Sequence, residues 1–276
     1  MNRPEKDIRV IVCDLDGTLL NSGKRISEKN LKAIKAARAK GVFTTICSGR
    51  VPAMLEAYSK EICIEIPLIA ANGGVIYDTL AARQMYTENI SAKVIEQVLD
   101  FFKDYDYGVL GSSGYFSKAS KRIKRFIHYN EIAKSKGLKE YPLYYIDELN
   151  YNQMLSMDIF KVLVSTISYE DTKKAKDFLD NQTNLTYTSS DRGLLDISAY
   201  GVSKGSGLSR LISIMGLSKE NVCVMGDYFN DISMFKAAGF SIAMANAHPD
   251  VKSQASSVTD SNDNGGVAAA IEKYIL

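Results

Sequence analysis

The chain has 276 residues, of which 46% are hydrophobic and 24% charged, so disordered and low-complexity classes are excluded. Its 34 basic and 32 acidic residues nearly balance, which argues against a nucleic-acid or membrane partner. No apolar stretch reaches the roughly 18 residues of a membrane span. The N-terminus also lacks a secretory signal pattern, so we expect a cytoplasmic protein.

Cysteine and histidine usage argues against two further kinds of site. The four cysteines, at positions 13, 47, 63 and 223, form no C-x2-C pair. A disulfide framework is not expected in so long a chain without a secretion signal. The two histidines, His128 and His248, are too few and too widely spaced for a structural zinc site.

The first 83 residues alternate between strand and helix patterns. Near-continuous apolar runs at 9–13, 42–47 and 67–71 predict buried strands, and Ser27 can cap a helix that stops near Gly41. Buried strands that alternate with helices favour a parallel sheet covered on both faces.

The middle of the chain has a different pattern. Helices are expected at 93–104, 121–136 and 171–180, among short Tyr- and Ser-rich strands at 107–111, 114–117, 141–146 and 159–166. A closing hairpin is expected at 185–188 and 193–197. This pattern predicts an α+β module with helices on one side of a mostly antiparallel sheet.

The α/β alternation returns after about residue 203. A helix that ends at Gly216 is followed by expected strands at 221–225, 240–243 and 257–259 and a terminal helix at 267–276. We therefore predict one α/β domain, over 1–83 and 198–276, that is split by an inserted module over 84–197.

Polar residues follow several of the predicted parallel strands. Asp14, Ser48, Asn72 and Asp227 stand where strands end, and ligands bind beyond the carboxyl ends of such strands. Acidic groups that meet at one sheet edge repel unless a hard cation lies between them. Mg²⁺ favours one or two carboxylates together with water and substrate phosphate, so the pattern predicts a Mg²⁺ site that also takes a phosphoryl group.

These residues belong to motifs that occur in a definite order. The motifs are Asp14-Leu15-Asp16-Gly17-Thr18, Ser48-Gly49-Arg50, Lys204, and Gly226-Asp227 followed by Asn230-Asp231. In this order the chain resembles the haloacid dehalogenase-like (HAD) hydrolases, and among them the Cof-type phosphatases with a type IIB cap. Segments 71–74, 201–205 and 262–267 share the resemblance, which covers essentially the whole chain. It implies a Rossmann-like core and an inserted cap that determines substrate specificity.

The resemblance implies roles for the acidic residues. Asp14 would attack phosphorus and form an aspartyl-phosphate. Asp16 would protonate the leaving alkoxide and later accept a proton from water. Mg²⁺ would be held by the Asp14 carboxylate, the Asp16 backbone carbonyl and Asp227. Asp231 and Thr18 would hold the metal ligands or Lys204 in position without binding the metal themselves.

The resemblance also implies which groups hold the phosphoryl oxygens. These would be Ser48, the backbone amides of Leu15 and Gly49, the Lys204 ammonium and Asn230. A cation on each side of the phosphate would offset its repulsion with the attacking carboxylate. The implied activity is Mg²⁺-dependent hydrolysis of small phosphorylated metabolites, such as sugar phosphates or phosphorylated cofactors.

Two other functions fit the same motifs. A phosphomutase of this superfamily would return the phosphoryl group to the bound sugar instead of giving it to water. A non-catalytic regulator would bind a phosphorylated ligand without turnover. Asn72 and Arg50 are equally compatible with substrate contact and with structural roles. The basic run at residues 118–125 favours a solvated helix face over a nucleic-acid site.

Overall fold

The protein is described from a computed structural model that places residues 7–118, 127, 130–135, 137–146, 150–191 and 193–276. Contacts between Cα atoms divide it into two compact units. The first comprises residues 1–49, 58–85 and 203–276, and the second comprises residues 50–57 and 86–202. The domain boundaries expected at 83/84 and 197/198 remain a prediction.

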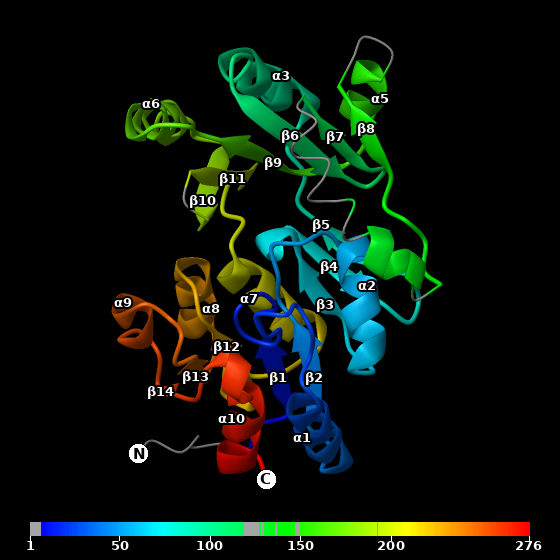
Figure 1. Cartoon of the computed structure of the whole chain (residues 1–276), viewed down its shortest axis with the longest axis vertical. Helices are drawn as coiled ribbons and strands as arrows, with labels where there is room; N and C mark the ends of the chain where they lie inside the picture. The colour runs from blue at the N-terminus through cyan, green and yellow to red at the C-terminus, as the bar shows by residue number, and fades with distance from the viewer. Residues whose placement is uncertain (1–6, 119–126, 128–129, 136, 147–149, 192) are drawn as a thin grey trace. The chain divides into compact units, whose positions relative to one another are not determined.

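A five-stranded parallel sheet forms the centre of the first unit, in the order β14-β13-β12-β1-β2 (Figure 1). The strands are β1 (Val10–Cys13), β2 (Phe43–Ile46), β12 (Val222–Gly226), β13 (Phe240–Ala243) and β14 (Ser257–Val258). All residues of β1, β12 and β13 are buried, as near-continuous apolar strands require in a covered parallel sheet. The α/β class with a parallel sheet, predicted from sequence, is thereby confirmed.

A small three-stranded sheet continues the first unit beside β2. It contains β3 (Leu68–Ala70), β4 (Val75–Asp78) and β5 (Arg83–Thr87). A parallel bridge between Cys47 and Ile69 joins β3 to the chain that leaves β2. The carboxyl end of β3 therefore lies next to that of β2.

The helices of the first unit begin at clear capping signals. Helix α1 (Glu28–Ala39) begins at Ser27, whose side chain accepts a hydrogen bond from the Asn30 backbone N–H, as predicted. Helix α7 (Lys204–Ile214) begins with a capping box between Ser203 and Ser206. Its neighbours are α8 (Ile232–Ala237), α9 (Pro249–Lys252) and α10 (Gly266–Tyr274). Helix α1 packs on α10, and α7 packs on α8.

The second unit is built on a six-stranded sheet in the order β10-β11-β9-β6-β7-β8. Its strands are β6 (Asp106–Gly111), β7 (Tyr115–Ser117), β8 (Leu143–Tyr145), β9 (Ile159–Ser165), β10 (Leu185–Asp191) and β11 (Leu194–Ala199). All neighbouring pairs are antiparallel except β7 with β8. Alternate residues of the sheet form one apolar core with α3 (Ala92–Phe101), α5 (Tyr151–Ser156) and α6 (Tyr169–Asp180). A mostly antiparallel sheet with helices on one face matches the expectation.

Several elements differ from the sequence-based expectation. The motifs predict neither α5 nor the strands β4 and β5, and helix α2 (Pro52–Glu61) is also unanticipated. Most of the helix expected over 121–136, with the basic run beside it, lies outside the described residues. In the described part of the chain, every helix is too short or too polar to cross a membrane.

Candidate active site

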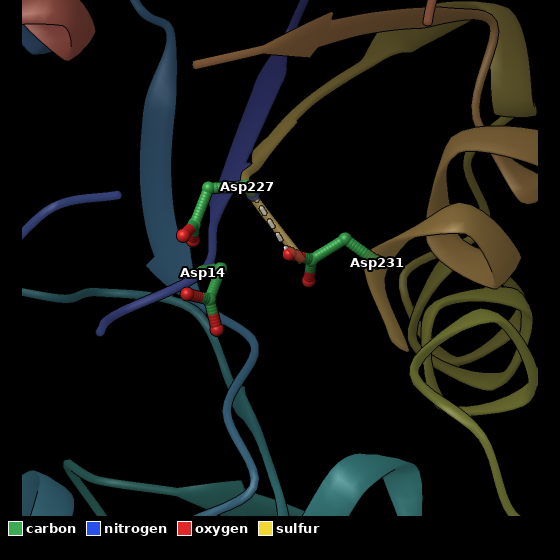
Figure 2. A group of neighbouring side chains, drawn as sticks. All are labelled: Asp14, Asp227 and Asp231. Atoms are coloured by element: carbon green, nitrogen blue, oxygen red, sulfur yellow. Dashed lines mark hydrogen bonds between the residues drawn. The ribbon is translucent and has the colours of Figure 1, made fainter. Parts of the chain in front are cut away.

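Three carboxylates meet at the carboxyl edge of the parallel sheet, those of Asp14, Asp227 and Asp231 (Figure 2). Asp14 follows β1 and Asp227 follows β12, and these strands are adjacent and in register, with Cys13 beside Met225. Each residue offers one oxygen, and these oxygens all lie within 4.8 Å of one another. The motif acids that the sequence places on separate strands are therefore brought together.

Asp231 anchors the loop that follows β12. It ends a short 3-10 helix, Phe229–Asp231, and is fully buried. Its Oδ2 accepts hydrogen bonds from the backbone N–H groups of Asp227 and Tyr228, both at 2.9 Å. A Cβ at Gly226 would lie 2.5 Å from the Asp231 Cγ, so only glycine fits there. These bonds occupy one Asp231 oxygen and fix the backbone that carries Asp227.

Lys204 connects two of the three carboxylates. Its Nζ donates to Asp14 Oδ1 and to Asp231 Oδ1, each at 2.5 Å, and its side chain is only 2% exposed. It is the first residue of α7, so the capping box at Ser203 fixes the backbone position from which the Lys204 side chain extends. Close packing of the helix start, where a Gly205 Cβ would lie 2.3 Å from the Ser233 carbonyl oxygen, holds α7 in place.

Burial and like charge shift the protonation of this cluster. Burial raises the pKa of Asp14 well above its usual value, against the lowering effect of Lys204, and Asp231 and Asp227 raise it further. Burial and the Asp231 carboxylate raise the pKa of Asp227 to about 6. Burial opposes charge on Lys204, but Asp14 and Asp231 outweigh it and raise its pKa. The cluster holds more negative charge than one ammonium can balance.

The turn after β1 holds the Asp227 side chain. Thr18 Oγ1 donates to Asp227 Oδ1 at 2.9 Å and so helps to orient this carboxylate. Gly17 has a φ of 84°, and a Cβ there would lie 2.3 Å from Asp227 Oδ2. Glycine is therefore required at this position both by the backbone and by the neighbouring carboxylate.

Asp16 lies apart from the three-carboxylate group. Its side chain is 38% exposed and accepts a hydrogen bond from Lys24 Nζ at 2.8 Å. Leu15, between the two acids, is buried. The partly exposed Asp16 carboxylate can exchange protons with solvent.

The second motif lies beside the turn after β3. Ser48 is buried, and its carbonyl oxygen accepts from the Asn72 backbone N–H at 3.0 Å. Asn72 is left-handed, with φ 55° and ψ 31°, and its Oδ1 accepts from Asn230 Nδ2 at 3.3 Å. A Cβ at Gly49 would lie 2.9 Å from the same Asn72 oxygen. Asn72 thus lies next to Ser48, Gly49 and Asn230, three residues that are predicted to bind the phosphoryl group.

Asn246 is a neighbour of the carboxylate group that the motif reasoning missed. It stands three residues beyond the end of β13, and its Nδ2 donates to the Gly17 carbonyl at 2.9 Å and to Asp227 Oδ2 at 3.3 Å. The strand-end rule that selects Asp14 and Asp227 could have found it, because β13 is also a parallel strand of this sheet.

The residues present suit a hard divalent cation. Three carboxylate oxygens lie within reach of one ion, and oxygen ligands are those that Mg²⁺ prefers. Burial first, and then the neighbouring carboxylates, raise the pKa values of Asp14 and Asp227, and a bound cation would oppose both effects. Both oxygens of Asp231 are already engaged, one by Lys204 and the other by the backbone N–H groups of Asp227 and Tyr228.

Comparison with known proteins places the chain among enzymes. A family model for haloacid dehalogenase-like hydrolases matches residues 11–271. The 5-amino-6-(5-phospho-D-ribitylamino)uracil phosphatase YwtE of Bacillus subtilis (strain 168) is 32% identical over 288 residues, covering 97% of this chain and 98% of that protein. YcsE of the same organism, a phosphatase named for the same substrate, is 29% identical over 280 residues, covering 100% of this chain and 99% of that protein.

Solved structures agree with the sequence comparison. A haloacid dehalogenase-like hydrolase from B. subtilis superposes with a TM-score of 0.83 at 26% identity, covering 96% of this chain and 99% of that one. The match extends over both units of the chain, and the two B. subtilis relatives named above are phosphatases. The chain therefore belongs to the haloacid dehalogenase-like hydrolases and is a phosphoric monoester hydrolase.

Proposed function

We propose that this phosphatase is Mg²⁺-dependent and hydrolyses its substrate through a phosphorylated Asp14. The observation that carries the proposal is the buried Lys204 ammonium, which binds Asp14 and Asp231 within a group of three carboxylates. A buried carboxylate that is fixed by a cation at one oxygen keeps its other oxygen available for attack.

The first step transfers the phosphoryl group to the protein. An Asp14 oxygen forms a bond to phosphorus as the bond to the substrate oxygen breaks, and Asp16 gives its proton to the departing alkoxide. Lys204 keeps Asp14 oriented and offsets the repulsion between carboxylate and phosphate. Mg²⁺, held by the Asp14 carboxylate, the Asp16 backbone carbonyl and Asp227, would neutralise charge on the phosphoryl oxygens.

The second step returns the protein to its starting state. Asp16 takes a proton from water, whose oxygen attacks phosphorus, and the bond to Asp14 breaks to release inorganic phosphate. The exposed position of the Asp16 carboxylate supports this role, since both the leaving group and water must reach it.

The remaining motif residues fit the binding of phosphoryl oxygens. Ser48 and the Gly49 amide follow β2, and Asn230 lies beside Asp231 in the loop after β12. Asn230 Nδ2 is the atom of this side chain that can donate to a phosphoryl oxygen, and it donates to Asn72 Oδ1 at 3.3 Å. We assign these groups, with the Leu15 amide and Lys204, to the phosphate.

We propose a small phosphorylated metabolite as substrate, either a sugar or polyol phosphate or a phosphorylated cofactor. The two B. subtilis relatives support this class, because both are named for a substrate with a phosphoribityl chain. The predicted cap over 84–197, most of which lies in the second unit, would select the group attached to the phosphate.

The test is phosphate release from a panel of pure substrates, with Mg²⁺ and with EDTA. The panel contains sugar phosphates, nucleotides, pyridoxal phosphate, flavin mononucleotide and 5-amino-6-(5-phospho-D-ribitylamino)uracil. We expect metal-dependent release, strongest for one or a few members, and none from an Asp14→Asn preparation made in parallel. Equal release with EDTA would overturn the metal assignment, and equal release by Asp14→Asn would overturn the nucleophile.

A further inference from the structure

Asn246 joins two loops that carry the proposed metal ligands. Its side-chain Nδ2 donates to the Gly17 carbonyl oxygen at 2.9 Å and to Asp227 Oδ2 at 3.3 Å. Gly17 directly follows Asp16 in the turn after β1, and Asp227 follows β12. One amide group therefore bridges segments 210 positions apart in the sequence, at the point where both approach the carboxylate cluster.

The Asp227 carboxylate has a donor at each oxygen. Thr18 Oγ1 donates to Oδ1 at 2.9 Å, and Asn246 supplies the donor to Oδ2. The close approach of Gly17, where a Cβ would lie 2.3 Å from Oδ2, limits the space on the same side. The two hydrogen-bond donors and the close contact with Gly17 together fix both the position and the rotation of this carboxylate.

Asn246 is itself held in one orientation. The Asn262 backbone N–H donates to Asn246 Oδ1 at 3.1 Å, so the amide presents its NH₂ group to Gly17 and Asp227. Asn262 is buried, and its own Nδ2 donates to the Leu20 carbonyl at 2.9 Å. This chain of amide hydrogen bonds connects the loop after β13, the 3-10 helix Asn262–Asn264 and the turn after β1.

We propose that Asn246 is a positioning residue for the metal centre, which holds Asp227 and the Asp14–Asp16 turn in the geometry that binds the cation. The inference rests on the proposed Mg²⁺ site and adds a residue outside its ligands. Partners that orient a ligating carboxylate without touching the metal typically change metal affinity by about 10–100-fold when removed. Nothing in the catalytic steps requires Asn246 to contact the substrate.

The test is Mg²⁺ binding by isothermal titration calorimetry, with Asn246→Ala compared against wild type. We expect the Mg²⁺ dissociation constant to rise about 10-fold or more. Activity should be recovered at high Mg²⁺, so that the Mg²⁺ concentration for half-maximal rate increases more than kcat falls. A general loss of structure would instead lower activity at every Mg²⁺ concentration.

The matched control is Asn264→Ala, an exposed asparagine two residues beyond Asn262. Its side chain makes no hydrogen bond within the described part of the chain, so its Mg²⁺ affinity should equal that of wild type. Should Asn246→Ala not fold, as judged by circular dichroism, Asn246→Ser enters the same comparison.

The outcomes separate this inference from the proposed function. A wild-type protein that binds no Mg²⁺ would overturn the metal assignment and this inference with it. Wild-type binding together with an unchanged dissociation constant in Asn246→Ala would overturn the inference alone. An equal loss in Asn264→Ala would also contradict it, because that variant leaves the amide chain intact.

Discussion

At the level of single residues, the site is governed by an imbalance of charge around Lys204. Three carboxylates share the site with one buried ammonium, and Asp14 and Asp231 both use it. Removal from water makes the excess negative charge costly, as the raised pKa of Asp227 shows. A phosphate dianion adds to this excess, so it can bind well only together with a further cation. The same imbalance is the physical basis of the proposed metal requirement.

The substitution Asp14→Asn tests the nucleophile without removing its packing. Asparagine has the same shape and retains an oxygen that can accept from Lys204, so the fold should be preserved. Turnover should fall by about 10⁴-fold or more, because an amide oxygen is a poor nucleophile. Phosphate release measures the first effect and the thermal midpoint the second. Wild-type turnover in a pure Asp14→Asn preparation would show that another residue attacks phosphorus.

Gly17→Ala tests whether the turn after β1 must approach Asp227. Alanine at a φ of 84° costs about 1 kcal/mol in strain, and its Cβ would displace the carboxylate 2.3 Å away. We expect kcat/KM to fall about 100-fold, as misplacement of a catalytic group by about 1 Å can do. The measurement is kcat/KM at several Mg²⁺ concentrations.

Gly41→Ala is the matched control for Gly17→Ala. Gly41 has a similar φ of 82°, but nothing lies within 4 Å of a Cβ built there. It should show a comparable loss of stability with normal kinetics. If both variants lost the same activity, backbone strain and not the contact with Asp227 would be responsible.

At the level of elements, strand ends made much of the site predictable. Apolar runs predict β1, β12 and β13 because strands buried on both faces need continuous apolar side chains. Adjacent parallel strands then place the residues that follow them at one edge, which is why Asp14 and Asp227 could be placed together from sequence. The parallel sheet could therefore be predicted from this rule alone, without knowing which distant segments of the chain contact one another.

Other features were not predictable because they depend on contacts between distant segments. Helix α5 has only six residues, too few for a periodic pattern to stand out. The ion pair between Lys24 and Asp16 depends on a left-handed Lys24, with φ 57°, that no local motif requires. The amide chain through Asn246 spans three separate loops, and only the folded backbone shows that these loops meet.

The sheet of the second unit contains a buried ion pair whose contribution can be measured. Lys161 Nζ on β9 donates to Asp196 Oδ2 on β11 at 2.8 Å, with side chains 6% and 3% exposed. Lys161→Met removes the cation beside a buried carboxylate and should lower the free energy of unfolding by about 3–5 kcal/mol. The double variant Lys161→Met/Asp196→Leu should recover most of this loss. Urea unfolding followed by circular dichroism suits a chain without tryptophan.

The exposed pair Lys103–Asp100 supplies the comparison for this ion pair. Its atoms are 3.8 Å apart and both side chains are mostly exposed. Lys103→Met should therefore change the free energy of unfolding by less than about 1 kcal/mol. A similar small change for Lys161→Met would show that the buried pair contributes no more than a surface pair.

For the whole molecule, the acidic cluster links stability to metal and to pH. The pKa of Asp227 is about 6 in the metal-free chain, against an ordinary value of 3.8. Between these values the folded chain binds more protons than the unfolded chain, so the Asp227 contribution to stability falls as pH rises through this window. Above about pH 6 the penalty is complete, and it is on the order of 1–3 kcal/mol. Without a bound metal, the charged Asp227 carboxylate therefore lowers the stability of the fold at neutral pH.

Mg²⁺ should remove this penalty, which gives a prediction that does not depend on substrate. At pH 7.5, Mg²⁺ at about 100 times its dissociation constant should stabilise the fold by about 2.7 kcal/mol, and the thermal midpoint should rise by several degrees. At pH 5 the rise should be smaller, because protons compete for Asp227. Asp227→Asn should raise the midpoint of the metal-free protein at pH 7.5 and abolish the response to Mg²⁺. The exposed substitution Asp100→Asn changes net charge equally and should leave that response intact. If Asp227→Asn responded to Mg²⁺ as fully as wild type, the stabilising ion would bind elsewhere, and the assignment of Asp227 as a metal ligand would be overturned.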